Sequence, residues 1–151
     1  MAAPETPESF TAEERAAMKE RAAELRAAAR RGKGKVDGET DLQEKLAEMP
    51  EGDRAMGERI HALVKEHAPQ LQPKTWYGQP AWAKDGKVVL FFQSSAKFNT
   101  RYSTLGFSEE AALDAGKMWA TSYALLELTG DDERRIAELI SRAASSQVGG
   151  R

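Results

Sequence analysis

Apolar and polar positions alternate most clearly between Thr75 and Phe92, where the chain reads TWYGQPAWAKDGKVVLFF. Asp85 and Gly86 divide this stretch, and Asp-Gly suits a two-residue hairpin loop because both positions tolerate a positive φ. The spacing predicts two antiparallel strands, with Trp82 opposite Val89. One predicted face carries Trp76, Trp82, Val89 and Phe91, and the other carries Tyr77, Ala81, Val88, Leu90 and Phe92. Both faces are apolar, so the rest of the chain has to cover this hairpin.

Helical patterns precede the hairpin. Thr11 and Glu14 form a capping-box pattern that opens a predicted helix over residues 12–31. This segment is rich in Ala, Glu, Lys and Arg but has only two main large apolar residues, Met18 and Leu25. Such a helix has a thin apolar stripe, so we expect it to pack lightly on the domain or to project from it.

Two further helices are expected before the hairpin and one near the end of the chain. Asp41 is a second predicted N-cap, for a short helix that ends before Pro50. The third helix runs from about 53 to 67 with one continuous apolar stripe, on which His67 is expected to be a packed imidazole. The last helix opens at 129–133.

The segments between the hairpin and the last helix predict more strands. Residues 97–107 alternate as a third strand, and 118–128 is β-biased and is expected to form a fourth. A short helix is expected over 108–115. This order predicts an α+β domain of two layers, with an antiparallel sheet of about four strands covered by helices. The expected organisation is a helical, partly loose arm with a basic linker over 1–36, the α+β domain over 37–145 and a flexible tail over 146–151.

Composition narrows the classes of function. A net charge of −2 argues against overall electrostatic binding to nucleic acid or to anionic membrane. The chain has no cysteine, which excludes disulfides and thiol chemistry. No apolar run is long enough to span a bilayer, and the first ten residues lack the features of a secretory signal, so a cytoplasmic location is expected.

The hairpin and the segment before it resemble a known family. The residues are HAP at 67–69, KTWYGQPAW at 74–82 and GKVVLFF at 86–92. They resemble the YdhG-like domain-of-unknown-function family, over about residues 42–144. The resemblance implies a frataxin-like α+β fold. One class of members is described as an intracellular iron chaperone that delivers iron to cluster assembly, so the resemblance implies iron, or an iron-accepting protein, as a partner. The chain departs from the simplest family pattern in its longer arm and in the strand over 118–128.

Metal binding has weak candidates in the sequence. A frataxin-like protein is expected to bind iron through surface carboxylates, since hard cations prefer oxygen ligands. The candidates are Glu44, Glu48, Glu58 and His61. Glu58 and His61 have the i, i+3 spacing of di-iron bundles, but those sites need two such pairs, and the chain has one. Capping and helix-dipole roles explain most of the acidic residues at helix starts without a metal.

Catalytic motifs are missing from the sequence. It contains no nucleophile elbow, no cysteine nucleophile, no zinc-protease helix motif and no dinucleotide fingerprint. We therefore expect no catalytic residues and no cofactor, and the alternative to iron handling is a small-molecule or protein-interaction module that uses the aromatic face of the sheet. The candidate ligand-binding residues are Trp76, Tyr77, Gln79, Trp82, Lys97, Arg101 and Tyr102. Packing into the core is the competing explanation for the aromatic residues.

Two local features of the sequence remain. Gly78 and Pro80 predict an irregularity in the first hairpin strand, with a close backbone approach or an unusual φ at Gly78 and an edge position or a bulge at Pro80. The basic segment from Arg26 to Lys35 is compatible with a phosphate or nucleic-acid contact. It has no interleaved aromatic residue, so a helix end followed by a solvated linker is the expected explanation.

Overall fold

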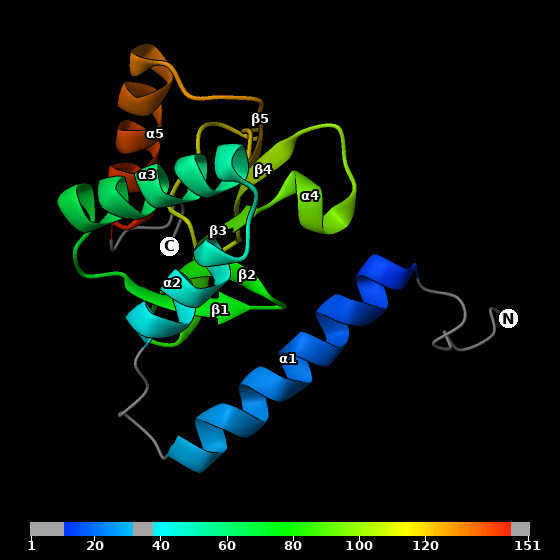
Figure 1. Cartoon of the computed structure of the whole chain (residues 1–151). Coiled ribbons are helices and arrows are strands. Elements are labelled where there is room, and N and C mark those ends of the chain that lie inside the picture. Colours follow the sequence, from blue (N-terminus) through cyan, green and yellow to red (C-terminus); the bar gives the residue numbers. More distant parts are fainter. Residues whose placement is uncertain (1–10, 32–37, 146–151) are drawn as a thin grey trace, which may run out of the picture.

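The computed structural model describes residues 11–31 and 38–145 of the chain (Figure 1). The elements in chain order are α1 (Ala12–Arg31), α2 (Gly38–Ala47), α3 (Glu51–His67), β1 (Gln72–Trp76), β2 (Gln79–Lys84), β3 (Lys87–Gln93), α4 (Ser95–Phe98), β4 (Ser103–Phe107), β5 (Ser122–Leu125) and α5 (Gly130–Ala143). The strands form one antiparallel sheet in the order β1-β2-β3-β4-β5, so each strand pairs with its neighbour in the sequence. The predicted α+β class is confirmed, with helices packed against the sheet.

The sheet has one strand more than expected because residues 75–84 do not form a single strand. Trp76 pairs with Gln79, which leaves Tyr77 and Gly78 as a two-residue loop between β1 and β2. Both loop residues have a positive φ, 55° and 76°, as a type I′ hairpin requires. The predicted unusual φ at Gly78 is confirmed. Its cause is a reversal of the chain, with Pro80 just beyond the loop and opposite Thr75.

The second hairpin confirms one prediction and corrects another. Asp85 and Gly86 form its loop with φ values of 52° and 81°. Between Ala83 and Trp82, however, the register shifts by one residue, and Trp82 pairs with Leu90 instead of Val89. Val89 is the extra residue of a β-bulge, which the uniformly apolar run in β3 gives no means to predict.

The loop and the bulge together redistribute the aromatic residues between the two faces of the sheet. Trp82 and Phe92 lie in the core. Trp76 and Phe91 lie on the opposite face, with their ring centroids 5.2 Å apart. The predicted sharing of a face by Trp76 and Trp82 is therefore wrong. We call the face with Trp76 and Phe91 the outer face.

Three predictions downstream of the hairpins also need correction. Residues 97–107 contain the end of α4, a loop and the short strand β4, and only Ser122–Leu125 is a strand within 118–128. The predicted helix over 108–115 does not form, because its polar groups bond to other parts of the chain. The Ser108 amide donates to the Val89 carbonyl, its hydroxyl donates to the Val88 carbonyl, and the Ala112 amide donates to the Ala143 carbonyl.

The core lies between the sheet and the helices α2, α3 and α5 (Figure 1). Leu42 and Leu46 come from α2, and Ile60 and Val64 from α3; all four are almost fully buried. The helix α5 contributes its apolar stripe after a capping box at Thr129 and Asp132, so the predicted opening of this helix is confirmed. The core cluster also takes in Trp82, Leu90, Phe92, Leu105, Ile136 and Ile140.

The helix α1 lies to one side of the domain, near the β1–β2 end of the sheet (Figure 1). Its predicted capping box between Thr11 and Glu14 is confirmed by two reciprocal hydrogen bonds of 3.0 Å. Among residues 12–26, the part of α1 with described side chains, Ala17 is the buried apolar residue, and it lies outside the core cluster. Met18 and Leu25 are 46% and 55% exposed. No helix in the described ranges has the length and apolarity to cross a membrane.

Candidate functional site

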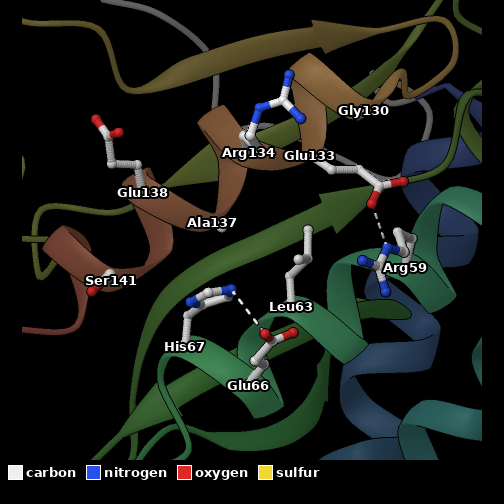
Figure 2. Close-up of a pocket in the computed structure, with 10 residues that line it drawn as sticks. All are labelled: Arg59, Leu63, Glu66, His67, Gly130, Glu133, Arg134, Ala137, Glu138 and Ser141. Atoms are coloured by element: carbon white, nitrogen blue, oxygen red, sulfur yellow. Dashed lines mark hydrogen bonds and ion pairs between the residues drawn. The ribbon is translucent and has the colours of Figure 1, made fainter.

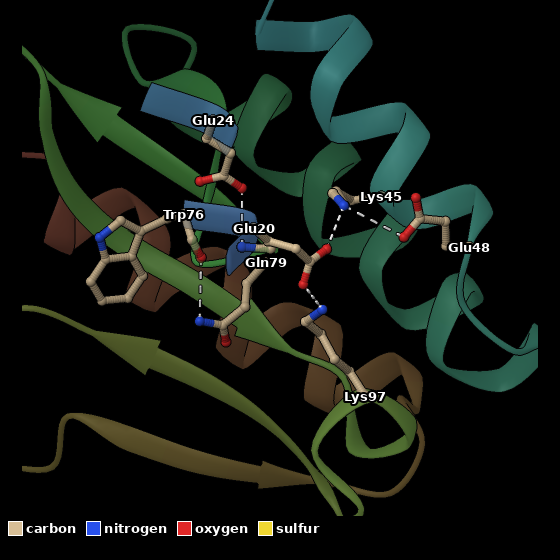
Figure 3. Close-up of polar contacts among 8 residues, drawn as sticks. Glu20, Glu24, Lys45, Glu48, Trp76, Gln79 and Lys97 are labelled. Atoms are coloured by element: carbon tan, nitrogen blue, oxygen red, sulfur yellow. Dashed lines mark hydrogen bonds and ion pairs between the residues drawn. The ribbon is translucent and has the colours of Figure 1, made fainter. Parts of the chain in front are cut away.

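The contacts of α1 with the domain centre on a small group of polar residues around the Tyr77–Gly78 loop. We call this group the arm site and define it as Lys45, Tyr77, Gly78, Gln79 and Lys97. Figure 3 shows three of its side chains, Lys45, Gln79 and Lys97. Lys45 comes from α2, Lys97 from α4, and the other three from the β1–β2 hairpin. Folding therefore gathers this site from three separate elements.

Glu20 of α1 lies between the two lysines of the arm site (Figure 3). Its Oε2 accepts a hydrogen bond from Nζ of Lys45 at 2.6 Å, and its Oε1 accepts one from Nζ of Lys97. The three side chains are mostly buried, with 21–25% of each exposed. One carboxylate thus pairs with two cations that face the same point.

Glu24 makes the next contact, one helical turn further along α1. Its Oε2 accepts a hydrogen bond of 3.0 Å from the backbone amide of Gly78. Beside it, the guanidinium of Arg21 lies over the ring of Tyr77, 5.5 Å from the centroid. The two residues of the β1–β2 loop therefore each bind α1, Gly78 through its backbone and Tyr77 through its ring.

The carboxylate of Glu20 lies close to position 78, where the residue is a glycine. A Cβ atom on Gly78 would lie 2.4 Å from Oε1 of Glu20, far inside van der Waals contact. Its φ of 76° also lies in the left-handed region, where glycine is unstrained. Residue 78 thus meets two demands at once, a tight loop and a helix packed against it.

The charges at the arm site stabilise one another. Burial opposes the ionisation of Glu20, but the hydrogen bonds and charges of Lys45 and Lys97 outweigh it and lower the pKa of this carboxyl group. Burial likewise opposes the charge of Lys45, yet the hydrogen bond to Glu20 raises its pKa. For the neighbouring Lys74, burial and the charge of Arg21 lower the pKa. The ammonium group of Lys74 therefore loses its proton more readily than that of Lys45.

Two buried acceptors near the loop have no hydrogen-bond donor among the described residues. Gln79 is 7% exposed; its Nε2 donates to the carbonyl of Trp76 at 3.4 Å, while its Oε1 has no partner. Oε1 of Glu24 also lacks a hydrogen bond and lies 3.6 Å from Nη1 of Arg21. A buried acceptor without a donor costs about 1–3 kcal/mol. One of these acceptors, on Gln79, belongs to the domain, and the other, on Glu24, belongs to α1.

Only some of the predicted ligand-binding residues converge. Lys97 reaches the Tyr77–Gly78 loop through Glu20, and Gln79 follows that loop directly. Trp76 lies beside them on the outer face, with its ring 5.2 Å from that of Tyr77. Three candidates lie elsewhere. Trp82 is fully buried in the core, and Arg101 stacks on Tyr102 at 5.2 Å.

Sequence reasoning did not identify Glu20, Glu24 and Lys45 as residues of a binding site. A signal for the two glutamates was present in the sequence. They lie at i and i+4 on a helix that has almost no apolar stripe, so polar contacts were the available means of docking it. No comparable signal marks Lys45, because one lysine near the end of a helix is ordinary.

The weak metal candidates do not come together. Glu48 lies 3.6 Å from Lys45, Glu44 lines a small cavity between α1 and α2, and Glu58 is exposed. Across residues 11–31 and 38–145, no three His, Cys, Asp or Glu side chains are grouped so that they could hold a metal ion. Iron binding stays a prediction without a ligand cluster in this part of the chain.

His61 has a structural environment instead. Nδ1 accepts a hydrogen bond of 3.0 Å from the indole of Trp82, and Nε2 lies 2.8 Å from a carboxylate oxygen of Glu39. Burial opposes the charge of Glu39, but hydrogen bonds from Gln43 and His61 outweigh it and lower the pKa of Glu39. A cavity of about 240 Å³ adjoins the His61–Trp82 pair, and Lys65, Pro69 and Pro73 are among its lining residues.

A wider open groove of about 650 Å³ runs between α3 and α5 (Figure 2). Arg59 and Glu133 form an ion pair of 2.6 Å across it. His67 lines this groove, with 36% of its side chain exposed and Nε2 3.7 Å from Glu66. The prediction of a packed imidazole at His67 is therefore wrong. The ring lies at the C-terminal end of α3, where the apolar stripe of the helix no longer packs into the core.

The remaining predicted site is the basic segment from Arg26 to Lys35. Its last part, residues 32–35, lies outside the described residues, and a nucleic-acid contact there stays a prediction. Comparisons of the chain with protein-family models, with curated proteins and with solved structures find no match. The resemblance to the YdhG-like family thus rests on the motif residues alone.

Proposed function

We propose that this protein is a binding module and that the arm site is its ligand-binding surface, with a preference for ligands that carry carboxylates. One observation carries the proposal. The chain's own carboxylates, Glu20 and Glu24, are held there by two lysines and a backbone amide from three different elements. This donor set is typical of protein sites that bind anions.

The two lysines support this function by their placement. Lys45 and Lys97 both contact the carboxylate of Glu20, and without an anion between them their charges repel each other. Glu48, 3.6 Å from Lys45 and more exposed, offsets this repulsion only in part. The fold holds them together although they stand on different helices, α2 and α4. An arrangement that is unfavourable when empty favours the binding of an anion.

Aromatic surface beside the lysines supplies the apolar part of a binding surface. Tyr77 is 39% exposed, and Trp76 packs edge-on against it with a centroid separation of 5.2 Å. Small-molecule and peptide sites commonly combine such aromatic surface with a few polar groups that fix orientation. The arm site has both components within one hairpin loop and its neighbours.

A titration with a small dicarboxylate tests this function. In the full-length Glu20→Gln/Glu24→Gln variant the carboxylates that occupy the site are gone, so we expect succinate to cause saturable NMR shifts of the Gly78 amide. Adding Lys97→Met to that variant should abolish them. Lys87→Met, an exposed lysine in the other hairpin, is the matched control and should leave them intact. Absence of any saturable shift at Gly78 would contradict the proposal.

The iron-chaperone role that the family resemblance implies is the competing proposal. It has no grouped ligands behind it among the described residues. An anaerobic titration with ferrous iron tests it separately, since succinate and iron bind through groups of opposite charge.

A further inference from the structure

We infer that the physiological ligand of the arm site is an acidic α-helix of a partner protein, and that α1 is its intramolecular competitor. This inference rests on the proposed function and adds to it the class of partner and a means of regulation. It follows from the way in which α1 itself occupies the site.

The first argument is helical geometry. Glu20 and Glu24 are four residues apart, so their side chains lie on one face of α1 about 6 Å from each other. The first reaches the lysine pair, and the second reaches the amide of Gly78. Two anions spaced in this way are supplied naturally by one helix with glutamates at i and i+4.

The second argument is the small residue on the same face. Ala17 lies three residues before Glu20 and is 6% exposed. Its burial indicates that this face of α1 is closely packed, and a Cβ atom on Gly78 would meet the carboxylate of Glu20. The site therefore favours a helix with the pattern small-x-x-Glu-x-x-x-Glu, which α1 supplies as Ala17, Glu20 and Glu24.

Exchangeable polar contacts are the main attachment of α1 to the domain. Residues 12–26, the part of α1 whose side chains the structure describes, place none in the core cluster, and the two large apolar residues of the helix are exposed. The two lysines and the Gly78 amide bind the carboxylates of α1 and can bind other carboxylates in the same way. A partner helix with two carboxylates in these positions can therefore replace α1.

Covalent attachment explains how α1 nevertheless competes. Six residues separate α1 from α2 in the sequence, and covalent attachment makes the contact of α1 with the arm site intramolecular, with a high effective concentration. A free helix that makes the same contacts must compete with α1 at that effective concentration. Its apparent association constant is the intrinsic constant multiplied by the fraction of molecules in which α1 leaves the site open. Removing the carboxylates of α1 should therefore raise the affinity for a helix added in trans.

The test uses a fluorescent peptide with the sequence of residues 11–31 and fluorescence anisotropy. We expect the peptide to bind the full-length Glu20→Gln/Glu24→Gln protein at least 10-fold more tightly than it binds the unmodified protein. The affinity should fall as salt is raised. A peptide with both glutamates replaced by glutamine should not bind. Lys45→Met/Lys97→Met, added to the same protein, should abolish binding of the original peptide.

The outcomes separate the inference from the proposed function. Succinate binding without peptide binding would retain the anion site and reject an acidic helix as its partner. Loss of both would reject both. Equal affinity of the peptide for the variant and for the unmodified protein would show that α1 does not compete, and would overturn the inference. Circular dichroism of each variant verifies that the domain is folded.

Discussion

The indole nitrogen of Trp82 donates a hydrogen bond to Nδ1 of His61, 3.0 Å away, inside the core. An indole N–H is a donor only, so Nδ1 must accept and the imidazole proton must lie on Nε2. There it faces Glu39 at 2.8 Å. These contacts connect β2 to α3 and α3 to α2. They also give the indole N–H of Trp82, the largest side chain in the core, a hydrogen-bond acceptor.

Truncation of Trp82 should therefore be costly. We expect Trp82→Ala to lower the free energy of unfolding by about 3–5 kcal/mol, because it removes a fully buried ring and leaves His61 without its donor. Trp119→Ala is the matched control, since this ring is 38% exposed, and it should cost less than about 1 kcal/mol. Urea unfolding measures both. A cost below about 1 kcal/mol for Trp82→Ala would contradict its place in the core.

Alanine at Gly78 separates backbone strain from the docking of α1. Gly78 and Gly86 occupy equivalent positions in the two hairpin loops, with φ of 76° and 81°. Alanine at either position adds strain of about 1–2 kcal/mol. Only at Gly78 does the new Cβ also meet Glu20, at 2.4 Å, whereas nothing lies within 4 Å at Gly86. We expect Gly78→Ala to release α1 as well, which faster amide exchange in residues 12–26 would report.

The control for this prediction is the same pair of substitutions in a Glu20→Ala protein. There the clash is absent, so Gly78→Ala and Gly86→Ala should cost the same within about 0.5 kcal/mol. Unchanged exchange in α1 after Gly78→Ala would show that the helix does not approach the loop as described.

Asp53 should make stability depend on pH in the acid range. Its carboxylate accepts hydrogen bonds from the Ser94 hydroxyl at 2.7 Å, the Ala96 amide at 3.1 Å and the Ser103 hydroxyl at 3.1 Å. Burial opposes its charge, but these bonds outweigh burial and lower the pKa of Asp53. The folded protein therefore binds a proton at Asp53 less readily than the unfolded chain does. In an unfolded chain the pKa of an aspartate is about 3.9.

The stabilisation from Asp53 is complete above the unfolded pKa and is lost as the pH falls through the folded pKa. We expect the urea midpoint to drop below about pH 4, and Asp53→Asn to weaken that dependence. Asp85→Asn is the control, since Asp85 is an exposed loop residue and asparagine also tolerates its positive φ. A pH dependence of Asp53→Asn equal to that of the unmodified protein would refute the role of Asp53.

Deletion of residues 1–35 should leave the domain folded. The deleted segment includes α1, and residues 12–26, the part of this helix with described side chains, contribute none to the core cluster. Its ion pairs with Lys45 and Lys97 are of the partly exposed kind, each of which contributes about 0–1 kcal/mol. We expect cooperative thermal unfolding with a melting temperature a few degrees lower. A broad, non-cooperative melt would show that α1 is part of the core structure.

Local signals in the sequence predicted the elements that depend on local interactions. The capping box at Thr11 and Glu14, the apolar stripe of α3 and the Asp85-Gly86 loop all lie where expected. The Tyr77-Gly78 loop was missed because Tyr-Gly is a weaker turn signal than Asp-Gly and because apolar residues continue through it. The irregularity expected near Gly78 and Pro80 corresponds to the reversal of the chain at this loop. The short helix expected over 108–115 failed because tertiary contacts took its hydrogen bonds.

By itself the sequence determined the α+β class, the bounds of the long helices and one hairpin, because hydrophobic periodicity, capping and turn chemistry act between residues near in the chain. Only the tertiary structure decided which residues form the arm site. Glu20 meets Lys45 and Lys97 across 25 and 77 positions of sequence, and each of these residues is ordinary in its own segment. The reversal at Gly78 and the packing of α2 and α4 bring them together, and long-range packing of this kind leaves no periodic signal in a single chain.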